Sequence, residues 1–110
     1  MATGKEAERL VLSKCLMELS KQGARVFRNN TGILQDRNGT PVKFGLCVGS
    51  SDIIGIYKGR FLAVECKATG KRVKPNSKQD KFLTIIRAHG GIAFECDDAN
   101  NIKKLLDEYS

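Results

Sequence analysis

The sequence has no run of apolar residues approaching the roughly 20 that a membrane-spanning helix requires. Its first residues do not lead into the apolar core of a signal peptide either. We therefore expect no membrane partner and a cytoplasmic protein that is not secreted. Internal repeats, low-complexity tracts and linkers are also missing, so the sequence predicts one domain spanning residues 1–110.

The four cysteines contain no C-x-x-C pair, which argues against a zinc site or a disulfide framework. Cys15, Cys47, Cys66 and Cys96 are far apart in the sequence, and each has apolar neighbours. We expect all four to be small core residues with reduced thiols.

The composition is that of an ordinary globular chain, with 41% hydrophobic and 28% charged residues among 110. Lys and Arg number 19 against 12 Asp and Glu, which leaves a formal net charge of +7. Such an excess favours a polyanionic partner, because basic surface attracts phosphates and releases their counterions. Basic charge can also serve solubility alone, so the positions of particular residues have to decide between these two interpretations.

The first part of the chain predicts a helix followed by a short strand. Apolar residues recur with helical spacing over 5–21, and Gly23 stands where a helix-ending glycine belongs. Residues 24–28 alternate like a strand, and the turn-forming stretch 29–32 ends it. The following segment is polar and punctuated by glycine, and it leaves room for an extended piece at 41–47.

A β-hairpin is predicted in the middle of the chain. The runs 52–57 and 60–67 are rich in β-formers and flank Lys58-Gly59, the sequence of a tight two-residue turn. A basic loop at 68–76 follows the second strand.

The last part of the chain predicts two helices around one strand. Ser77 can cap a helix that reaches about His89, with Asp80 completing a variant capping box. Ile92–Cys96 is predicted as a strand, and a final helix starts near Asp98. The apolar face of this last helix consists of Ile102, Leu105, Leu106 and Tyr109. The order α-β-β-β-α-β-α predicts an α/β fold with a mixed sheet flanked by helices.

The predicted hairpin brings three charged residues together. A two-residue loop sets Tyr57 opposite Arg60, and the same register sets Asp52 opposite Glu65. Facing residues project to the same side of a sheet, and so does Lys67, two positions beyond Glu65. Two carboxylates and an ammonium group therefore meet at one end of the hairpin.

Two facing carboxylates destabilise a strand pair unless a cation lies between them. Mg²⁺ meets this need, because it is typically held by one or two carboxylates together with substrate phosphates. The alternative is a solvated Glu-x-Lys pair worth less than ~1 kcal/mol, next to an aspartate in an ordinary turn. Glu65 lies inside an otherwise apolar run, 61–67, which solvation does not explain. The combination favours a functional site.

Two polar residues fall on helix faces that should be apolar. Glu8 lies on the stripe formed by Val11, Leu12 and Cys15, where a carboxylate is costly without a cation or several donors. It is a candidate third acidic ligand, unless the helix begins after it and the carboxylate only favours the helix dipole. Gln79 shares the apolar face of the second helix, where its amide could bond the lysine or a phosphate, although a first-turn glutamine is usually solvated.

The ordered set of motifs resembles the VRR-NUC family, the virus-type replication-repair nucleases of the PD-(D/E)xK superfamily, which has a restriction-endonuclease-like fold. The matching stretches are Ala7-Glu8-Arg9-Leu10, Arg28-Asn29-Asn30-Thr31-Gly32, Gly49-Ser50-Ser51-Asp52, Val64-Glu65-Cys66-Lys67 and Ser77-Lys78-Gln79. Each motif is weak alone, but together they cover nearly the whole chain in the right order. Ser51 departs from the family pattern, because a proline often precedes the acidic residue there.

The resemblance implies a set of roles at this site. Mg²⁺, or Mn²⁺ in its place, would be bound by Glu8, Asp52, Glu65 and the main-chain carbonyl of Cys66. The catalytic residues would be Asp52, Glu65, Lys67 and Gln79, with Lys67 positioning or activating the attacking water. Glu6 is close enough in sequence to take the place of Glu8 as the helix acid.

The resemblance further implies a structure-specific endonuclease that cuts branched DNA, such as Holliday junctions, as a homodimer. The expected nucleic-acid contacts are Arg28, Asn30, Ser50, Ser51, Lys71, Arg72, Lys74 and Lys78. Two alternatives stay open at this point. One is another nuclease of the superfamily, of the flap, single-strand or restriction type, and the other is a nucleic-acid-binding module without catalysis.

Overall fold

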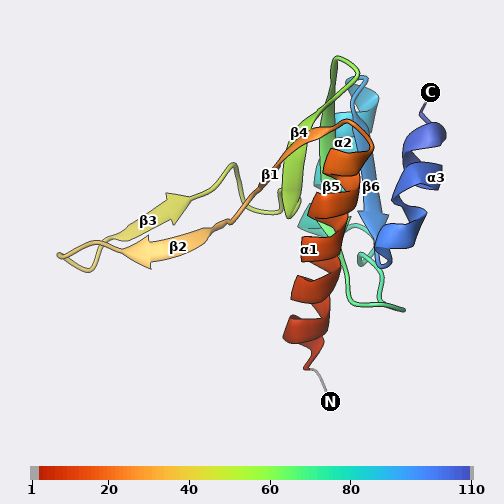
Figure 1. The fold of residues 1–110 in the computed structure, drawn as a ribbon. Coiled ribbons are helices and arrows are strands. Elements are labelled where there is room, and N and C mark those ends of the chain that lie inside the picture. Colours follow the sequence, from red (N-terminus) through yellow and green to blue (C-terminus); the bar gives the residue numbers. More distant parts are fainter. Residues whose placement is uncertain (1–2, 110) are drawn as a thin grey trace.

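A mixed four-stranded sheet occupies the middle of the protein (Figure 1), in a computed structural model that describes residues 3–109. Its strand order is β1-β4-β5-β6, with β1, β4 and β5 antiparallel and β6 parallel to β5. A separate two-stranded sheet is formed by β2 and β3. The α/β class and the mixed sheet with flanking helices are therefore confirmed.

The elements follow the sequence closely in all but one region. Their bounds are α1 Gly4–Lys21, β1 Arg25–Arg28, β2 Gly32–Gln35, β3 Pro41–Phe44, β4 Ile53–Tyr57, β5 Arg60–Cys66, α2 Lys78–Ala88, β6 Ile92–Cys96, the 3₁₀ turn η1 Ala99–Asn101 and α3 Ile102–Asp107. The predicted order had too few strands, because it left out β2 and did not count the extended piece expected at 41–47, which contains β3. These strands are short and almost entirely exposed, so no buried face imposes a clear alternation on their sequence.

The hairpin register of β4 and β5 is confirmed. Tyr57 pairs with Arg60, and the ladder runs from there to Ile53 opposite Val64. Lys58 and Gly59 both have positive φ, at 49° and 76°, as a two-residue turn of this hand requires.

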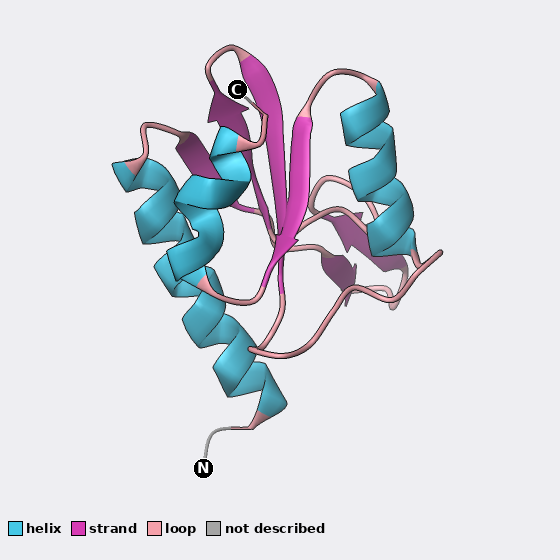
Figure 2. Cartoon of the chain, turned by 90° about the vertical axis from the view of Figure 1, so that its right-hand side faces the viewer, coloured by secondary structure: helices cyan, strands magenta, loops and turns pink. Residues whose placement is uncertain are grey.

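Helices cover both faces of the sheet (Figure 2). On one face, α1 and α3 pack against alternate strand residues, including Ile53, Leu62 and Val64, to form the main core. On the other face, α2 packs against β5 and β6 through Leu83, which contacts Ala63 and Ala93. Because side chains alternate along a strand, the neighbours of the main-core residues on β4 and β5 face the α2 side.

Local signals place the two long helices. In α2 the Ser77 hydroxyl accepts the N–H of Asp80, while the Asp80 carboxylate accepts the N–H of Asn76, so both partners of the predicted box form bonds. Both long helices end in a glycine with positive φ, Gly23 at 96° and Gly90 at 87°. Every helix within residues 3–109 falls short of the length or apolar character needed to span a bilayer.

The cysteines divide into two kinds. Cys15, Cys66 and Cys96 are buried and free, as predicted, and the sulfur atoms of Cys15 and Cys96 are 3.7 Å apart. Cys47 is exposed, so its prediction as a core residue was wrong. It lies in the segment that leads from β3 back to the main sheet, where its apolar neighbours Leu46 and Val48 are exposed too.

Candidate metal centre

Asp52 lies immediately before β4, one position beyond the last pair of the β4–β5 ladder. Its Oδ2 accepts the backbone N–H of Cys66 at 2.9 Å, and its carbonyl accepts the N–H of Asn29 at 2.7 Å. The half-buried carboxylate is thus fixed against the end of β5 rather than free in a turn. The predicted approach of Asp52 to the end of β5 is present, although Asp52 and Glu65 are not a ladder pair.

Glu65 is a buried carboxyl group with an unmet hydrogen-bonding need. The residue is 4% exposed, and no hydrogen-bond partner for its Oε2 is found within residues 3–109. Burial, followed by the negative charge of Asp52 and a side-chain hydrogen bond between Glu65 and Asp52, raises the pKa of Glu65 from 4.5 to about 8. Lys67 lowers this pKa and Glu8 raises it, both by smaller amounts, so all three charges act on the same carboxyl group.

A cavity of about 320 Å³ connects Asp52 with the first helix. Its lining includes Glu8 and Asp52, together with Arg28 at the end of β1. Glu6, the other candidate for the helix acid, is exposed in the first turn of α1, where its N–H donates to the Thr3 hydroxyl. The geometry therefore groups Glu8, rather than Glu6, with Asp52.

Gln79 does not line the cavity that Glu8 shares with Asp52. It is half-buried near the start of α2 and lines a different cavity, of about 800 Å³, with Gly49 and residues of β2 and β3.

The loop before Asp52 is held by a residue that sequence reasoning missed. The Asn29 side-chain amide donates to Ser50 Oγ at 2.7 Å and to the carbonyl of Ser51 at 2.9 Å. Its Oδ1 accepts the N–H of Leu46 at 3.3 Å. The sequence offered only a weak signal, since Asn29 belonged to a matched stretch but looked like a turn residue.

Ser50 and Ser51 have a structural role that differs from the predicted one. They are 7% and 0% exposed, and their hydroxyls donate to the carbonyls of Cys47 and Ile53, both at 2.7 Å. These hydroxyls have almost no surface to offer a phosphate, so we revise both serines from nucleic-acid contacts to residues that position Asp52.

The other expected nucleic-acid contacts are exposed. They are Arg28, Asn30, Lys71, Arg72, Lys74 and Lys78. Arg72 forms a 3.3 Å ion pair with Glu95, which is the register partner of Glu65 in the parallel β5–β6 pair. Glu95 was also missed, although it interrupts an apolar strand as Glu65 does.

The donor set suits a hard divalent cation that keeps water or phosphate ligands. Within residues 3–109 no cluster of three or more His, Cys, Asp or Glu side chains is arranged to hold a metal ion. Mg²⁺ needs fewer, since one or two carboxylates plus phosphates and waters suffice. The unpartnered Oε2 of Glu65 beside Asp52 is the observation that fits, because a nearby cation would satisfy it and favour the ionised form.

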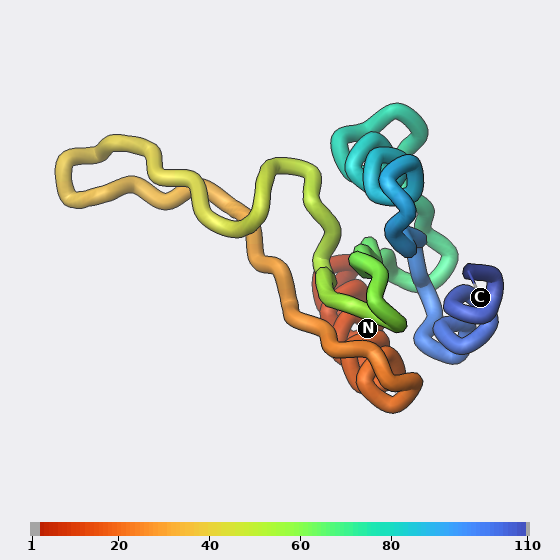
Figure 3. The backbone as a smooth tube through the Cα atoms, turned by 90° about the horizontal axis from the view of Figure 1, so that it is seen from above, coloured from red at the N-terminus to blue at the C-terminus, as the bar shows by residue number. Residues whose placement is uncertain are grey.

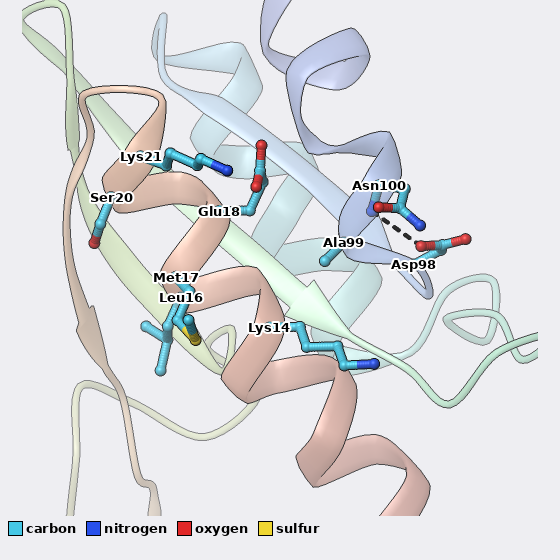
Figure 4. Close-up of a pocket in the computed structure, with 9 residues that line it drawn as sticks. All are labelled: Lys14, Leu16, Met17, Glu18, Ser20, Lys21, Asp98, Ala99 and Asn100. Carbon is cyan, nitrogen blue, oxygen red and sulfur yellow. Dashed lines mark hydrogen bonds between the residues drawn. The ribbon is translucent and has the colours of Figure 1, made fainter.

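A larger cavity lies elsewhere in the protein. It has a volume of about 940 Å³ and runs between α1 and the Asp98–Asn100 segment, lined by residues such as Lys14, Met17 and Glu18 (Figure 4). Asp98 there accepts the N–H of Asn100 at 2.9 Å and caps η1. The acidic group at the end of β5 is the better candidate for chemistry, because Glu65 and Asp52 act on each other there. The smaller cavity is lined by Asp52 and Glu8 but not by Glu65.

Comparison with known proteins gave no relative: no family model matches the chain, and no curated protein matches it.

Proposed function

We propose that this protein is a Mg²⁺-dependent, structure-specific DNA endonuclease of the PD-(D/E)xK type, related to the VRR-NUC family. The observation that carries the proposal is the buried Glu65 carboxyl group, unpartnered at Oε2 within the described residues and next to Asp52. Two adjacent carboxyl groups, one of them buried, favour a proton on Glu65 unless a cation lies between them, and a purely structural role gives no reason to place them together.

The chain supplies distinct roles around the proposed metal. Asp52 and Glu65 would bind the ion, with the carbonyl of Cys66 and the carboxylate of Glu8 as further donors. A bound Mg²⁺ or Mn²⁺ would supply positive charge that stabilises the phosphoryl group in the transition state and acidifies a water molecule. Lys67 would hold the attacking water beside the scissile phosphate. Gln79 would contact a phosphate from the start of α2.

The proposed substrate is branched DNA, such as a four-way junction. The net charge of +7 and the exposed cations of the 68–76 loop support a nucleic-acid partner. Matched cuts in two strands need two acidic centres, and one chain has a single group of this kind among residues 3–109, so we propose that the enzyme acts as a homodimer.

The first test is cleavage of a labelled four-way junction by the wild type with Mg²⁺, Mn²⁺ or a chelator. We expect nicks only with metal, and a loss of at least about 100-fold in rate for Glu65→Ala and Lys67→Ala. Both variants should still bind the junction in Ca²⁺. Glu6→Gln is the matched control for Glu8→Gln, because both acids lie in the first turns of α1 but only Glu8 lines the cavity with Asp52. Full activity of Glu65→Ala would falsify the assignment.

A competition experiment then separates the substrate classes. Unlabelled junction, duplex, flap and single-stranded DNA are compared as competitors of the labelled junction. The proposal expects the junction to compete best and the duplex worst. If a flap or a single strand competes best, the protein is still a nuclease but its substrate is not a junction. If the protein binds DNA without metal and forms no product, it is a non-catalytic binding module.

A further inference from the structure

The β2–β3 hairpin projects from the body of the protein as an arm (Figures 1 and 3). It forms its own two-stranded sheet, and among residues 3–109 neither strand pairs with the main sheet. An isolated two-stranded hairpin is at best marginally stable in water. The arm therefore needs a surface to pack against.

The two faces of the arm differ in character. The register pairs Leu34 with Val42 and Gly32 with Phe44, so the large residues of these pairs share one face. Leu34, Val42 and Phe44 are 65%, 48% and 40% exposed, and the Phe44 ring lies over Gly32, where an added Cβ would be 2.6 Å from it. The opposite face pairs Ile33 with Lys43 and Gln35 with Pro41 and is more polar. Such alternation is typical of a sheet with one buried face.

The main sheet has an apolar strip that α2 leaves uncovered. Ile56 pairs with Phe61 and lies on the α2 side, as does Phe27 on β1. The helix α2 packs against β5 and β6, farther along the sheet, and these three side chains remain 56%, 39% and 58% exposed. The chain thus has both a projecting apolar face and a flat apolar strip.

We infer that the arm binds a second copy of this chain, laying the face formed by Leu34, Val42 and Phe44 on the partner's strip formed by Phe27, Ile56 and Phe61. A two-fold axis makes the contact reciprocal, so that each arm covers the other copy's strip. This inference deepens the proposed function by naming the surface that joins two copies, but the contact itself needs neither metal nor DNA.

The available apolar area is about what a dimer interface needs. The six large apolar side chains of the contact, each 39–65% exposed, are Phe27, Leu34, Val42, Phe44, Ile56 and Phe61. With about 150–250 Å² for an aromatic side chain and somewhat less for the others, they offer on the order of 500 Å² per copy. Two copies would bury on the order of 1,000 Å² through these side chains alone, which is about the threshold for a biological interface.

The charge of the arm favours protein over DNA as its occupant. Residues 32–44 contain Arg37, Lys43 and Asp36, so the arm has only two cations and no concentration of cationic residues above that of the chain as a whole. A DNA-binding arm needs several cations for phosphate contacts.

The test is the oligomeric state of the full chain, measured by sedimentation equilibrium over a range of concentrations without metal or DNA. We expect a dimer for the wild type, and a dissociation constant at least about tenfold higher for Leu34→Lys and for Ile56→Lys. Ile33→Lys is the matched control, because this neighbouring residue is 58% exposed on the other face of the arm. Circular dichroism verifies that each variant is folded.

A mixing experiment tests the arm-to-strip contact itself. At concentrations below their raised dissociation constants, Leu34→Glu and Ile56→Lys should each be monomeric. Mixing the two variants should restore a dimer. In that dimer one arm-to-strip contact is native, and the other places the introduced glutamate of one copy against the introduced lysine of the other. A monomeric wild type, no rescue on mixing, or equal weakening by Ile33→Lys would overturn the inference. The inference would also be overturned if the wild type were a monomer and Leu34→Lys weakened only its binding to DNA.

Glu65→Ala should remain a dimer, because the contact does not involve the acidic group. A wild type that dimerises but cuts no DNA rejects only the proposed nuclease. A wild type that cuts DNA as a monomer rejects only the arm contact.

Discussion

Glu65 shows how one buried side chain can report on a site. Its carboxyl group lies at the end of β5 with Asp52 nearby, and both burial and that neighbouring charge favour the protonated form. Without a cation, the folded protein therefore keeps a proton on Glu65 at a pH where the unfolded chain has lost it. This difference links the stability of the fold to pH.

We predict that the metal-free protein loses stability as pH rises from 4.5 to 8 and that Glu65→Gln removes this loss. The pKa of Glu65 is raised to about 8 in the folded state, so its contribution is fully present below 4.5 and is gone above 8. The amplitude is at most a few kcal/mol. Urea unfolding at pH 5 and pH 8, in the presence of a chelator, measures it. If the free energy of unfolding falls equally between pH 5 and pH 8 in the wild type and in Glu65→Gln, another group is responsible for the loss.

The residues of the site were predictable to different degrees. A two-residue turn at Lys58-Gly59 fixes the register, so the approach of Asp52 to the end of β5 followed from counting along the strands. The burial of Ser50 and Ser51 did not follow, because small polar residues after a glycine look the same in an open turn and in a bonded one. Their environment is set by Asn29, 21 and 22 positions away in the sequence.

At the scale of elements, the acidic group depends on how a loop joins two strands. The segment that returns from β3 reaches β4 through Ser50 and Ser51, and the Asn29 amide ties both to the end of β1. Gly49 packs against α2 here, since an added Cβ would lie 2.6 Å from the Cβ of Lys78. Asp52 thus enters β4 from a loop held on two sides.

We predict that Asn29→Ala destabilises the fold by about 1–3 kcal/mol, because it leaves buried partners without their hydrogen bonds. Asn30→Ala is the matched control, since Asn30 is the exposed neighbour in the same turn. Urea unfolding measures the stability, and Mg²⁺-dependent cleavage of a junction measures the effect on Asp52. A stability loss equal to that of Asn30→Ala would mean that the Asn29 bonds do not hold the loop.

The helices and central strands could be predicted because local signals agree with the tertiary fold. Ser77 caps α2 as expected, and glycines end both long helices. The β2–β3 arm could not be predicted in this way. Within residues 3–109 its strands have no buried face. The spacing of apolar residues reflects which face is buried and does not reflect strand pairing itself. If a second copy covers the arm, the face of β2 and β3 that is buried lies between two copies, where the pattern of a single chain does not reveal it.

At the scale of the whole molecule, exposed lysines lie both beside the acidic group and far from it in the sequence. The 68–76 loop, which follows Lys67 directly, presents exposed Lys71 and Lys74, while Lys14 and Lys21 on α1 border the large cavity shown in Figure 4. The pairs contribute equally to the net charge of +7, but only the first belongs to the loop beside the acidic group. Their comparison separates local phosphate contacts from the general attraction of a basic protein.

We predict that Lys71→Ala/Lys74→Ala weakens junction binding. The plot of the logarithm of the binding constant against log salt should become less steep by about 2, because each lost phosphate contact reduces its steepness by about 0.9. Lys14→Ala/Lys21→Ala, which lowers the net charge by the same amount, should leave the slope nearly unchanged. Binding is measured in Ca²⁺ with the Glu65→Ala background, so that cleavage does not consume the DNA. Equal slopes for the two double variants would mean that DNA responds to the total charge of the protein and that the 68–76 loop has no special place in the complex.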